Sequence, residues 1–336
     1  MEENPYQRMQ AIAGREVARS LGVDLQILFA KNDALIQSEQ LLNAIHSSKH
    51  SELDGIVCAP VGTTRTALMQ AARSAAAAGI GWAVLNREVD YITELRSSHQ
   101  VPIFAVSPDQ GSIGRIQGQQ IGVLLPAGGH TLYLLGPTGN SASEKRLAGM
   151  QAGLPANVEP KTLVGDWSEE SGYRAVGRWL QLRAPNTPAV RLVASQNDDM
   201  AIGAKKAFEE MTSGDEQDWW LGLPYIGCDC CAGAGREWVN RGLLTSSVIN
   251  PPSAGLALQM MVRAIQTKTQ PPERTILAPE SYPETEKLRN RPSRNAWIDR
   301  VKAMEVALHE TDNGVVLDSE VDQERLELFG RIPRII

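Results

Sequence analysis

Short apolar runs alternate with longer helical patterns along most of this 336-residue chain. Runs of about six residues rich in Val, Ile and Leu are typical of buried strands, whereas apolar residues at every third or fourth position are typical of helices. This alternation indicates βαβ units, in which helices cover both faces of a parallel sheet. We therefore predict an α/β fold with two doubly wound parallel-sheet lobes.

The predicted elements fall into two groups. The first has strands at Asp24–Ala30, Gly55–Pro60, Trp82–Arg87 and Ile103–Pro108, and helices at Leu35–Lys49 and Thr64–Ala78. The second has strands at His130–Pro137, Thr162–Trp167, Val190–Asn197 and Leu223–Asp229, and helices at Gly111–Leu125, Ser141–Gly153, Glu169–Arg183 and Asp198–Thr212. The pattern changes near Pro283, and we interpret residues 285–336 as a C-terminal appendage with a helix at Asn295–Glu310.

Charge and hydropathy narrow the function classes. With 33 Lys and Arg against 39 Asp and Glu, the net charge is −6, the wrong sign for a chain that mainly neutralises phosphates. We therefore expect no nucleic acid as a partner. No apolar run approaches the ~18 residues of a membrane helix, and residues 1–8 show neither the basic nor the apolar region of a secretory signal.

Catalytic, metal and nucleotide motifs are weak. Cys228, Cys230 and Cys231 are close together but lack the second cluster that a structural zinc site commonly needs, so we favour buried thiols and expect no metal. The turn Leu135–Ser141 resembles a phosphate loop without its Lys-Ser/Thr pair, and is better read as a strand-to-helix turn. Asp198 is a candidate helix N-cap. We predict neither a cofactor nor a catalytic set.

Polar residues end several predicted strands, where ligands bind in open α/β sheets. Planar amides, guanidinium groups, a carboxylate and aromatic rings together suit a sugar, because fork-shaped groups bind vicinal hydroxyls and rings stack on the C–H faces. The residues that form this inventory are Tyr6, Asn86, Arg87, Arg146, Trp167, Asn197, Asp229 and Asn250.

Several segments, taken in their order along the chain, resemble those of a known family. They are Asn4-Pro5-Tyr6, Asp54–Pro60, Ala78–Ile80 leading to Leu85–Arg87, Ser141–Gly149, Ser195–Ala204, Ile226–Asp229 and Val248–Gly255. This set resembles the periplasmic sugar-binding proteins of ABC importers, of the ribose-binding type, whose type I periplasmic-binding fold is shared with lactose-repressor effector domains. The resemblance covers roughly residues 3–283.

The resemblance implies a hinge with three crossings, near Val106–Ser107, Asn250 and Leu277. The implied N-terminal lobe is 1–106 plus 251–276, and the C-terminal lobe is 107–250 plus 277–284. The implied ligand contacts are Asn4, Tyr6, Gln7, Asn86 and Arg87 in the first lobe and Arg146, Trp167, Asn197, Asp229 and Asn250 in the second.

Three positions depart from the family pattern. Gln7 stands where a second aromatic residue is common, and Asn86 where Asp is common, so a more polar or different ligand is expected. The Asn-Pro-aromatic motif lies at residues 4–6, so we expect the first strand of the fold to be absent from this chain. That loss would leave backbone donors and acceptors unpaired on the neighbouring strand.

The main hypothesis is a non-enzymatic solute-binding protein, a monomer that delivers a monosaccharide or sugar-like polyol to an ABC permease. The resemblance implies the periplasm or cell envelope, whereas a genuine start at Met1 implies the cytoplasm. The alternative is a sugar-sensing regulatory or effector domain without a transport role.

Overall fold

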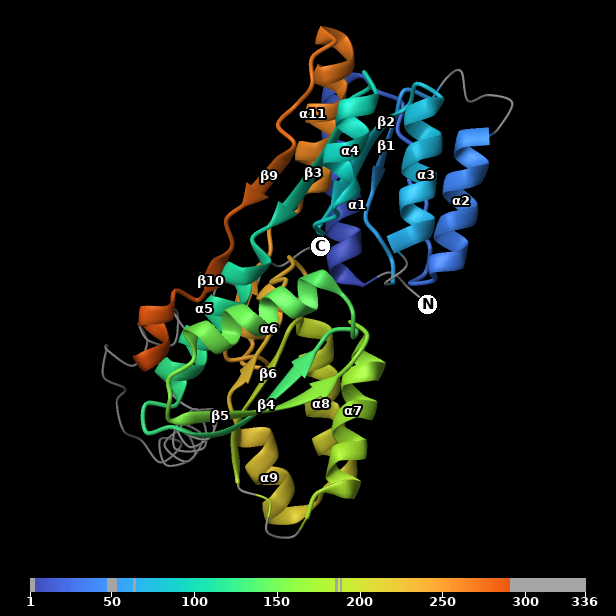
Figure 1. The fold of residues 1–336 in the computed structure, drawn as a ribbon. Coiled ribbons are helices and arrows are strands. Elements are labelled where there is room, and N and C mark those ends of the chain that lie inside the picture. Colours follow the sequence, from blue (N-terminus) through green and yellow to red (C-terminus); the bar gives the residue numbers. More distant parts are fainter. Residues whose placement is uncertain (1–3, 47–52, 63–64, 185–186, 188, 291–336) are drawn as a thin grey trace, which may run out of the picture. The chain divides into compact units, whose positions relative to one another are not determined.

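A computed structural model describes residues 4–46, 53–62, 65–184, 187 and 189–290 of the chain. These residues form two α/β lobes, each built around a four-stranded parallel sheet (Figure 1). The α/β fold class predicted from the sequence is confirmed. The predicted helix at Asn295–Glu310 lies outside the described residues.

The first lobe contains a sheet with strand order β1-β2-β3-β9. Its strands are β1 (Gly55–Cys58), β2 (Gly81–Leu85), β3 (Ile103–Pro108) and β9 (Arg274–Leu277). Its helices are α1 (Pro5–Leu21), α2 (Ala34–His46), α3 (Arg65–Ala77), α4 (Tyr91–Ser98) and α11 (Ala254–Thr267). Alternate residues of β2 face opposite layers: Trp82 and Val84 pack with α3 and α4, whereas Ala83 and Leu85 pack with α11. This full burial explains the continuous apolar runs in the sequence.

The second lobe contains a sheet with strand order β5-β4-β6-β7. Its strands are β4 (Gly129–Leu135), β5 (Val158–Val164), β6 (Val190–Ser195) and β7 (Tyr225–Ile226). Its helices are α5 (Gln110–Leu124), α6 (Ser141–Gly153), α7 (Glu169–Leu182), α8 (Asp198–Met211), α9 (Gly214–Gly222) and α10 (Gly235–Asn240). Helices α5 and α6 cover one face of the sheet, and α7, α8 and α9 cover the other.

The described chain is completed by a short antiparallel pair, β8 (Ser247–Ile249) and β10 (Glu280–Tyr282), and by a 3₁₀ helix, η2 (Thr285–Asn290). The helix η2 packs against α5 and buries Leu288.

The chain passes between the lobes at three places. It leaves the first sheet after β3 to begin α5, and returns between β8 and α11. It crosses again between β9, which pairs with β3, and β10, which pairs with β8. Three crossings of short backbone give the lobes a joint that can act as a hinge.

One predicted strand is wrong. Asp24–Ala30 forms no strand, although its burial still alternates, with Leu25 and Ile27 less exposed than Asp24 and Gln26. Within the described residues β1 pairs with β2 alone and is the edge of its sheet. The segment Asp24–Ala30 therefore has the side-chain pattern of a strand but pairs with none of the described strands, and the outer edge of β1 stays unpaired.

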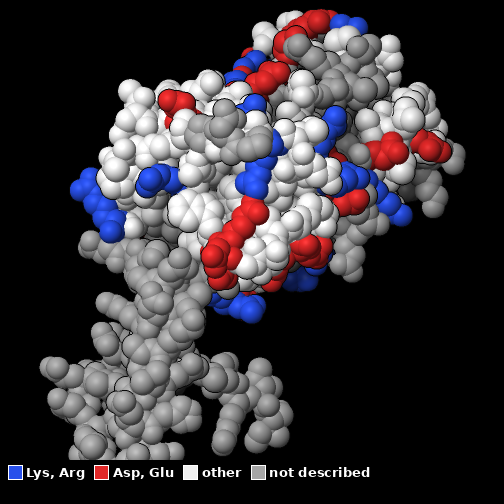
Figure 2. All heavy atoms as spheres, turned by 90° about the horizontal axis from the view of Figure 1, so that it is seen from below, with Lys and Arg blue, Asp and Glu red and all other residues white. Residues whose placement is uncertain are grey.

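The described surface carries charges of both signs. In the face shown in Figure 2, Lys and Arg lie among Asp and Glu rather than in one patch of a single sign. No helix among the described residues has the length and apolar character needed to cross a membrane.

Glycines allow α5 and α6 to pack at backbone contact. A Cβ added at Gly114 would lie 1.9 Å from the Arg146 carbonyl oxygen, and one at Gly149 would lie 2.0 Å from the Gly111 carbonyl oxygen. Because no side chain separates the helices, the distance between them is set by the backbones themselves. This contact positions the start of α5 beside the middle of α6, where Arg146 lies.

We expect Gly114→Ala to lower the free energy of unfolding by about 1–3 kcal/mol, because the added methyl group must push two backbones apart. Thermal and urea unfolding measure the change. The matched control is Gly111→Ala on the same helix, where the nearest atom to the new Cβ is the Asp109 side-chain oxygen at 3.4 Å. An unchanged stability of Gly114→Ala would show that α5 and α6 do not require this close approach.

Candidate functional site

Several residues beyond the ends of strands have left-handed backbone conformations, and three of them are candidate ligand contacts. Asn86 follows β2 with a φ of 60°, Trp167 follows β5 with a φ of 76°, and Asp229 follows β7 with a φ of 106°. Non-glycine residues rarely adopt such values, and those that do concentrate at binding and catalytic sites. All three were predicted as ligand contacts, and the backbone directs each side chain away from the path of its strand.

In the first lobe, three polar side chains form a hydrogen-bond network with Asn86. The Asn86 Oδ1 atom accepts hydrogen bonds from the Tyr6 hydroxyl at 3.1 Å, from Ser253 Oγ at 2.8 Å and from Gln10 Nε2 at 3.3 Å. The same Gln10 Nε2 donates to the Tyr6 hydroxyl at 2.9 Å and to Ser253 Oγ at 3.2 Å. Gln10 and Ser253 were not predicted. Gln10 lies one helical turn after Tyr6, which was the only available signal.

The other first-lobe candidates lie at the edges of this network. Asn4 caps α1, its Oδ1 accepting from the backbone N–H of Gln7 at 2.9 Å. Arg87 donates through NH1 to the Gly62 carbonyl, in the loop after β1. Gln7 is half-buried on the first turn of α1.

In the second lobe, Arg146 is a buried guanidinium with neutral partners. Its Nε donates to Gln110 Oε1 at 2.7 Å and its NH1 donates to the Gln196 carbonyl. Gln110 Nε2 in turn donates to the Asn86 carbonyl at 3.4 Å, so a chain of hydrogen bonds joins the two lobes. The guanidinium also lies 5.4 Å from the centre of the Trp167 ring.

Asn197 positions Trp167. Its Nδ2 donates to the Trp167 carbonyl at 2.8 Å, and its Oδ1 caps α8 by accepting from the Met200 N–H at 3.1 Å.

The prediction that Asp198 is the N-cap of α8 is therefore wrong. Asp198 is the first residue of α8, and its carboxyl instead accepts from the Cys230 N–H and from Ser247 Oγ, each at 2.7 Å. Burial raises the pKa of Asp198 well above its usual value.

Asp229 and Asn250 form a pair with one unused acceptor. Asn250 Nδ2 donates to Asp229 Oδ1 at 2.9 Å, but Asn250 Oδ1 is fully buried and has no hydrogen-bond partner among the described residues. A buried acceptor without a donor costs free energy unless another molecule supplies one. Burial raises the pKa of Asp229 to about 6, although Arg146 favours its charged form.

The structure brings residues of the two lobes together around Tyr6. Its hydroxyl belongs to the first-lobe network, while its ring packs in one cluster with Cys231 and Ala234 of the second lobe. The charges of Asp229 and Arg146 both act on its hydroxyl. The Trp167 ring lies against Gly136 and beneath Arg146.

The cysteines near the site are buried thiols. Burial raises the pKa of Cys230 to about 12, and the pKa values of Cys228 and Cys231 are raised for the same reason. The thiols are therefore protonated at neutral pH, which disfavours metal binding. Among the described residues, no group of three or more His, Cys, Asp or Glu side chains is arranged to hold a metal ion.

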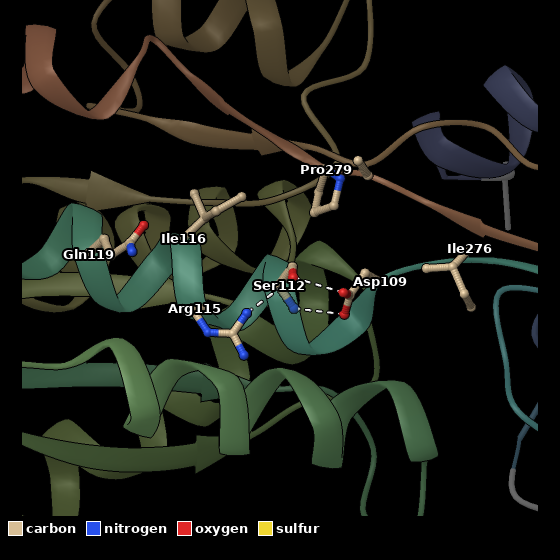
Figure 3. A pocket seen from close by; sticks show the side chains of 8 residues that line it. Asp109, Ser112, Arg115, Ile116, Gln119, Ile276 and Pro279 are labelled. Carbon is tan, nitrogen blue, oxygen red and sulfur yellow. Dashed lines mark hydrogen bonds between the residues drawn. The ribbon is translucent and has the colours of Figure 1, made fainter.

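A separate cavity of about 340 Å³ lies beside the hinge, where the first and third crossings meet (Figure 3). Three of its polar side chains bond one another: Asp109 accepts from the Ser112 N–H and hydroxyl, and Arg115 donates to Ser112 Oγ at 3.2 Å. The fourth, Gln119, is exposed to solvent, so no buried polar group of this cavity lacks a partner. The strained backbones and the buried acceptor of Asn250 lie elsewhere, at the ends of the strands.

The model of the periplasmic binding protein domain family matches residues 2–269, which include every candidate residue of this site. The chain belongs to this family. Members of the family bind solutes rather than transform them, in agreement with the prediction that the protein is not an enzyme.

Two curated relatives of this binding protein are similar in sequence. A provisionally named rhizopine-binding protein of Rhizobium meliloti is 29% identical over 195 residues, which cover 56% of this chain and 58% of the relative. A xylitol-binding protein of Mycolicibacterium smegmatis is 25% identical over 261 residues, covering 76% of this chain and 68% of the relative. The first match thus spans less than two thirds of that relative.

Solved structures share the fold of this binding protein. An ABC transporter periplasmic solute-binding protein from Actinobacillus succinogenes with bound D-allose superposes with a TM-score of 0.71 at 19% identity, covering 87% of this chain and 97% of that one. A solute-binding protein from Bacillus halodurans with bound myo-inositol gives a TM-score of 0.68 at 20% identity, covering 85% of this chain and 93% of that one. At these identities the likeness establishes the type I fold.

We expect Gly136→Ala to displace the Trp167 ring, because a Cβ at position 136 would lie 2.1 Å from a ring carbon of Trp167. The expected cost is about 1–3 kcal/mol in the free energy of unfolding, with a changed tryptophan environment in near-ultraviolet circular dichroism. Gly14→Ala is the control, since its new Cβ would meet only a Leu25 methyl group at 3.6 Å. A Gly136→Ala spectrum identical to that of the parent would contradict the placement of Trp167.

Proposed function

We propose that this protein captures a monosaccharide or sugar-like polyol in a cleft between its two lobes and delivers it to an ABC-type importer. The buried Asn250 Oδ1 atom carries the proposal, because it has no donor within the described residues and lies beside the Asp229 carboxyl. A ligand rich in hydroxyl groups supplies donors to both oxygens. The curated relatives named for binding rhizopine and xylitol, and the related folds with bound D-allose and myo-inositol, support a polyhydroxylated ligand.

The proposed contacts combine direct and supporting residues. The proposed direct contacts are Asn86, Arg87, Trp167, Asp229 and Asn250, which follow strands, and Arg146, which lies in the middle of α6. Asn4, Gln7, Tyr6 and Asn197 complete the site at helix starts, where Asn4 and Asn197 serve as N-caps. Closure of the lobes brings the two sets around the solute.

The proposed lobes follow the three crossings. Residues 1–106 with 251–276 form the N-terminal lobe, residues 107–250 with 277–284 form the C-terminal lobe, and residues 285–336 form the appendage. The proposed partners are the membrane subunits of an ABC permease, with the protein acting as a monomer in the periplasm. Neither the described contacts nor these relatives favour the alternative of a sugar-sensing regulatory domain.

A thermal-shift screen against pentoses, hexoses, polyols and inositols tests the proposal. A ligand that binds only the folded state adds about 2.7 kcal/mol of stability at a hundredfold excess over its Kd. We expect a selective increase in Tm with one chemical class. A clean unfolding transition that no compound shifts would overturn the proposal.

Substitutions in the site test the residue assignment. We expect Trp167→Ala and Asp229→Ala each to weaken binding of the solute found in the screen by about 1–3 kcal/mol, roughly 5- to 150-fold in Kd, measured by calorimetry. Matched controls are Trp219→Ala and Asp215→Ala, both on the exposed part of α9. Equal affinities in the site variants and the controls would show that the ligand binds elsewhere.

The affinity should depend on pH through Asp229. Its folded-state pKa of about 6 lies above the ordinary value of 3.8, so it takes up a proton as the pH falls through about 6. The protonated carboxyl loses part of its capacity to accept from ligand hydroxyls, and we expect affinity to fall between about pH 7.5 and about pH 5. Calorimetry at several pH values measures this fall, and Asp229→Asn should flatten it. A profile in Asp229→Asn as steep as that of the parent would assign the dependence to another group.

A further inference from the structure

The orientation of the Asn86 amide is fixed by a relay of hydrogen bonds that begins at a backbone donor. The Ala254 N–H can only donate, and it donates to Gln10 Oε1 at 2.8 Å. Gln10 must therefore present its Nε2 to the Tyr6 and Ser253 hydroxyls, as observed. Ser253 Oγ accepts from Gln10 and donates to Asn86 Oδ1 at 2.8 Å. The Tyr6 hydroxyl also accepts from Gln10, and its Asn86 Oδ1 acceptor at 3.1 Å is nearer than its other acceptor, the Pro251 carbonyl, at 3.4 Å.

This relay leaves Asn86 with donors alone for a ligand. The Tyr6 and Ser253 hydroxyls occupy the two lone pairs of its Oδ1, whereas its Nδ2 has no hydrogen-bond partner among the described residues and is not enclosed. The neutral amide thus behaves at this position as a directed N–H group. A ligand atom that faces it must be an acceptor.

Arg87, the next residue, adds a cation without a counter-ion. It is half-buried and donates to the neutral Gly62 carbonyl, and no carboxylate of the described residues lies within ion-pair distance. The adjacent acid, Glu88, instead pairs with Lys145 and with Arg274 at 3.6 Å. A half-buried guanidinium favours a nearby anion, because burial penalises an uncompensated charge.

The opposite wall has the reverse character. Asp229 and the unpartnered Asn250 Oδ1 present acceptors, and Arg146 lies on the same side as a cation that is partly balanced by Asp229. The first-lobe end of the site therefore offers donors and a cation whose charge no described carboxylate pairs. The second-lobe end offers acceptors beside the Arg146 guanidinium, whose charge Asp229 partly balances. A ligand that satisfies both ends carries acceptors at one end and hydroxyl donors at the other.

We propose that the solute is a sugar acid, a polyhydroxylated carboxylate whose carboxylate binds Asn86 Nδ2 and Arg87 while its hydroxyls face Asp229 and Asn250. This inference rests on the proposed function of the cleft and names the ligand class within it. Guanidinium and amide N–H groups suit a planar carboxylate, to which they donate charge-assisted hydrogen bonds.

Calorimetry with matched pairs tests the inference. The pairs are D-glucose with D-gluconate and D-glucuronate, D-galactose with D-galactonate and D-galacturonate, and xylitol with D-xylonate, measured at one pH above 7 and at constant ionic strength. We expect at least one acid to bind about tenfold or more tightly than its neutral partner. Neutral compounds that bind as tightly as their acids would overturn the sugar-acid inference and leave the proposed function standing. Absence of binding across both sets and the wider screen would overturn both.

Asn86→Asp identifies the group that selects the acid. Aspartate is nearly isosteric and still accepts from Tyr6, Gln10 and Ser253, but it replaces the directed N–H with a negative charge. We expect the preference for the acid over its neutral partner to fall by about tenfold or more. Asn240→Asp is the matched control, an exposed position of α10 whose Oδ1 accepts from the Tyr282 hydroxyl at 2.7 Å. An acid preference that is unchanged in Asn86→Asp, in a variant that unfolds with the parent Tm, would overturn the placement of the carboxylate at Asn86.

Discussion

The requirement that buried polar side chains be hydrogen-bonded determines the geometry of this molecule at the ends of its strands. Arg146 enters the interior because Gln110 and the Gln196 carbonyl receive its N–H groups, and those partners are in reach because α5 and α6 touch at backbone distance. A wider helix pair would separate Arg146 from Gln110 and leave a buried guanidinium incompletely bonded. The glycines of α5 and α6 therefore determine whether the hydrogen bonds of Arg146 can form, because they allow the close contact between the two helices.

The two lobes meet this requirement in different ways. In the first lobe the network closes on itself, and Asn86 Oδ1 has as many donors as it can use. In the second lobe the requirement is left partly unmet, since no described residue donates to the buried Asn250 Oδ1. The first lobe thus presents side chains whose orientation is fixed by their hydrogen bonds. The second lobe presents a buried acceptor to which a solute can donate.

The fold was largely predictable from the sequence, because fully buried strands such as β2 and β3 leave continuous apolar runs that little else explains. Asp24–Ala30 was mispredicted since its pattern is that of a strand, while a ladder depends on a neighbour that local sequence does not reveal. The residues at strand ends, such as Asn86 and Asp229, could be predicted once the strands that precede them were identified. Gln10 and Ser253 were not, because their role arises from contacts between helices more than 200 residues apart in sequence. Asn197 caps α8 in place of Asp198 because the helix begins one residue earlier than the N-cap prediction required. Residue type alone does not determine where a helix begins.

Gln110 has a mechanical consequence for the hinge. It belongs to α5, bonds Arg146 strongly within the second lobe at 2.7 Å, and reaches the Asn86 carbonyl of the first lobe through a longer bond of 3.4 Å. Separation of the lobes breaks this longer bond and the ion pair between Lys145 of α6 and Glu88 of the first lobe, while the shorter bond keeps Gln110 with Arg146. The second lobe therefore keeps its guanidinium bonded and oriented when the site opens.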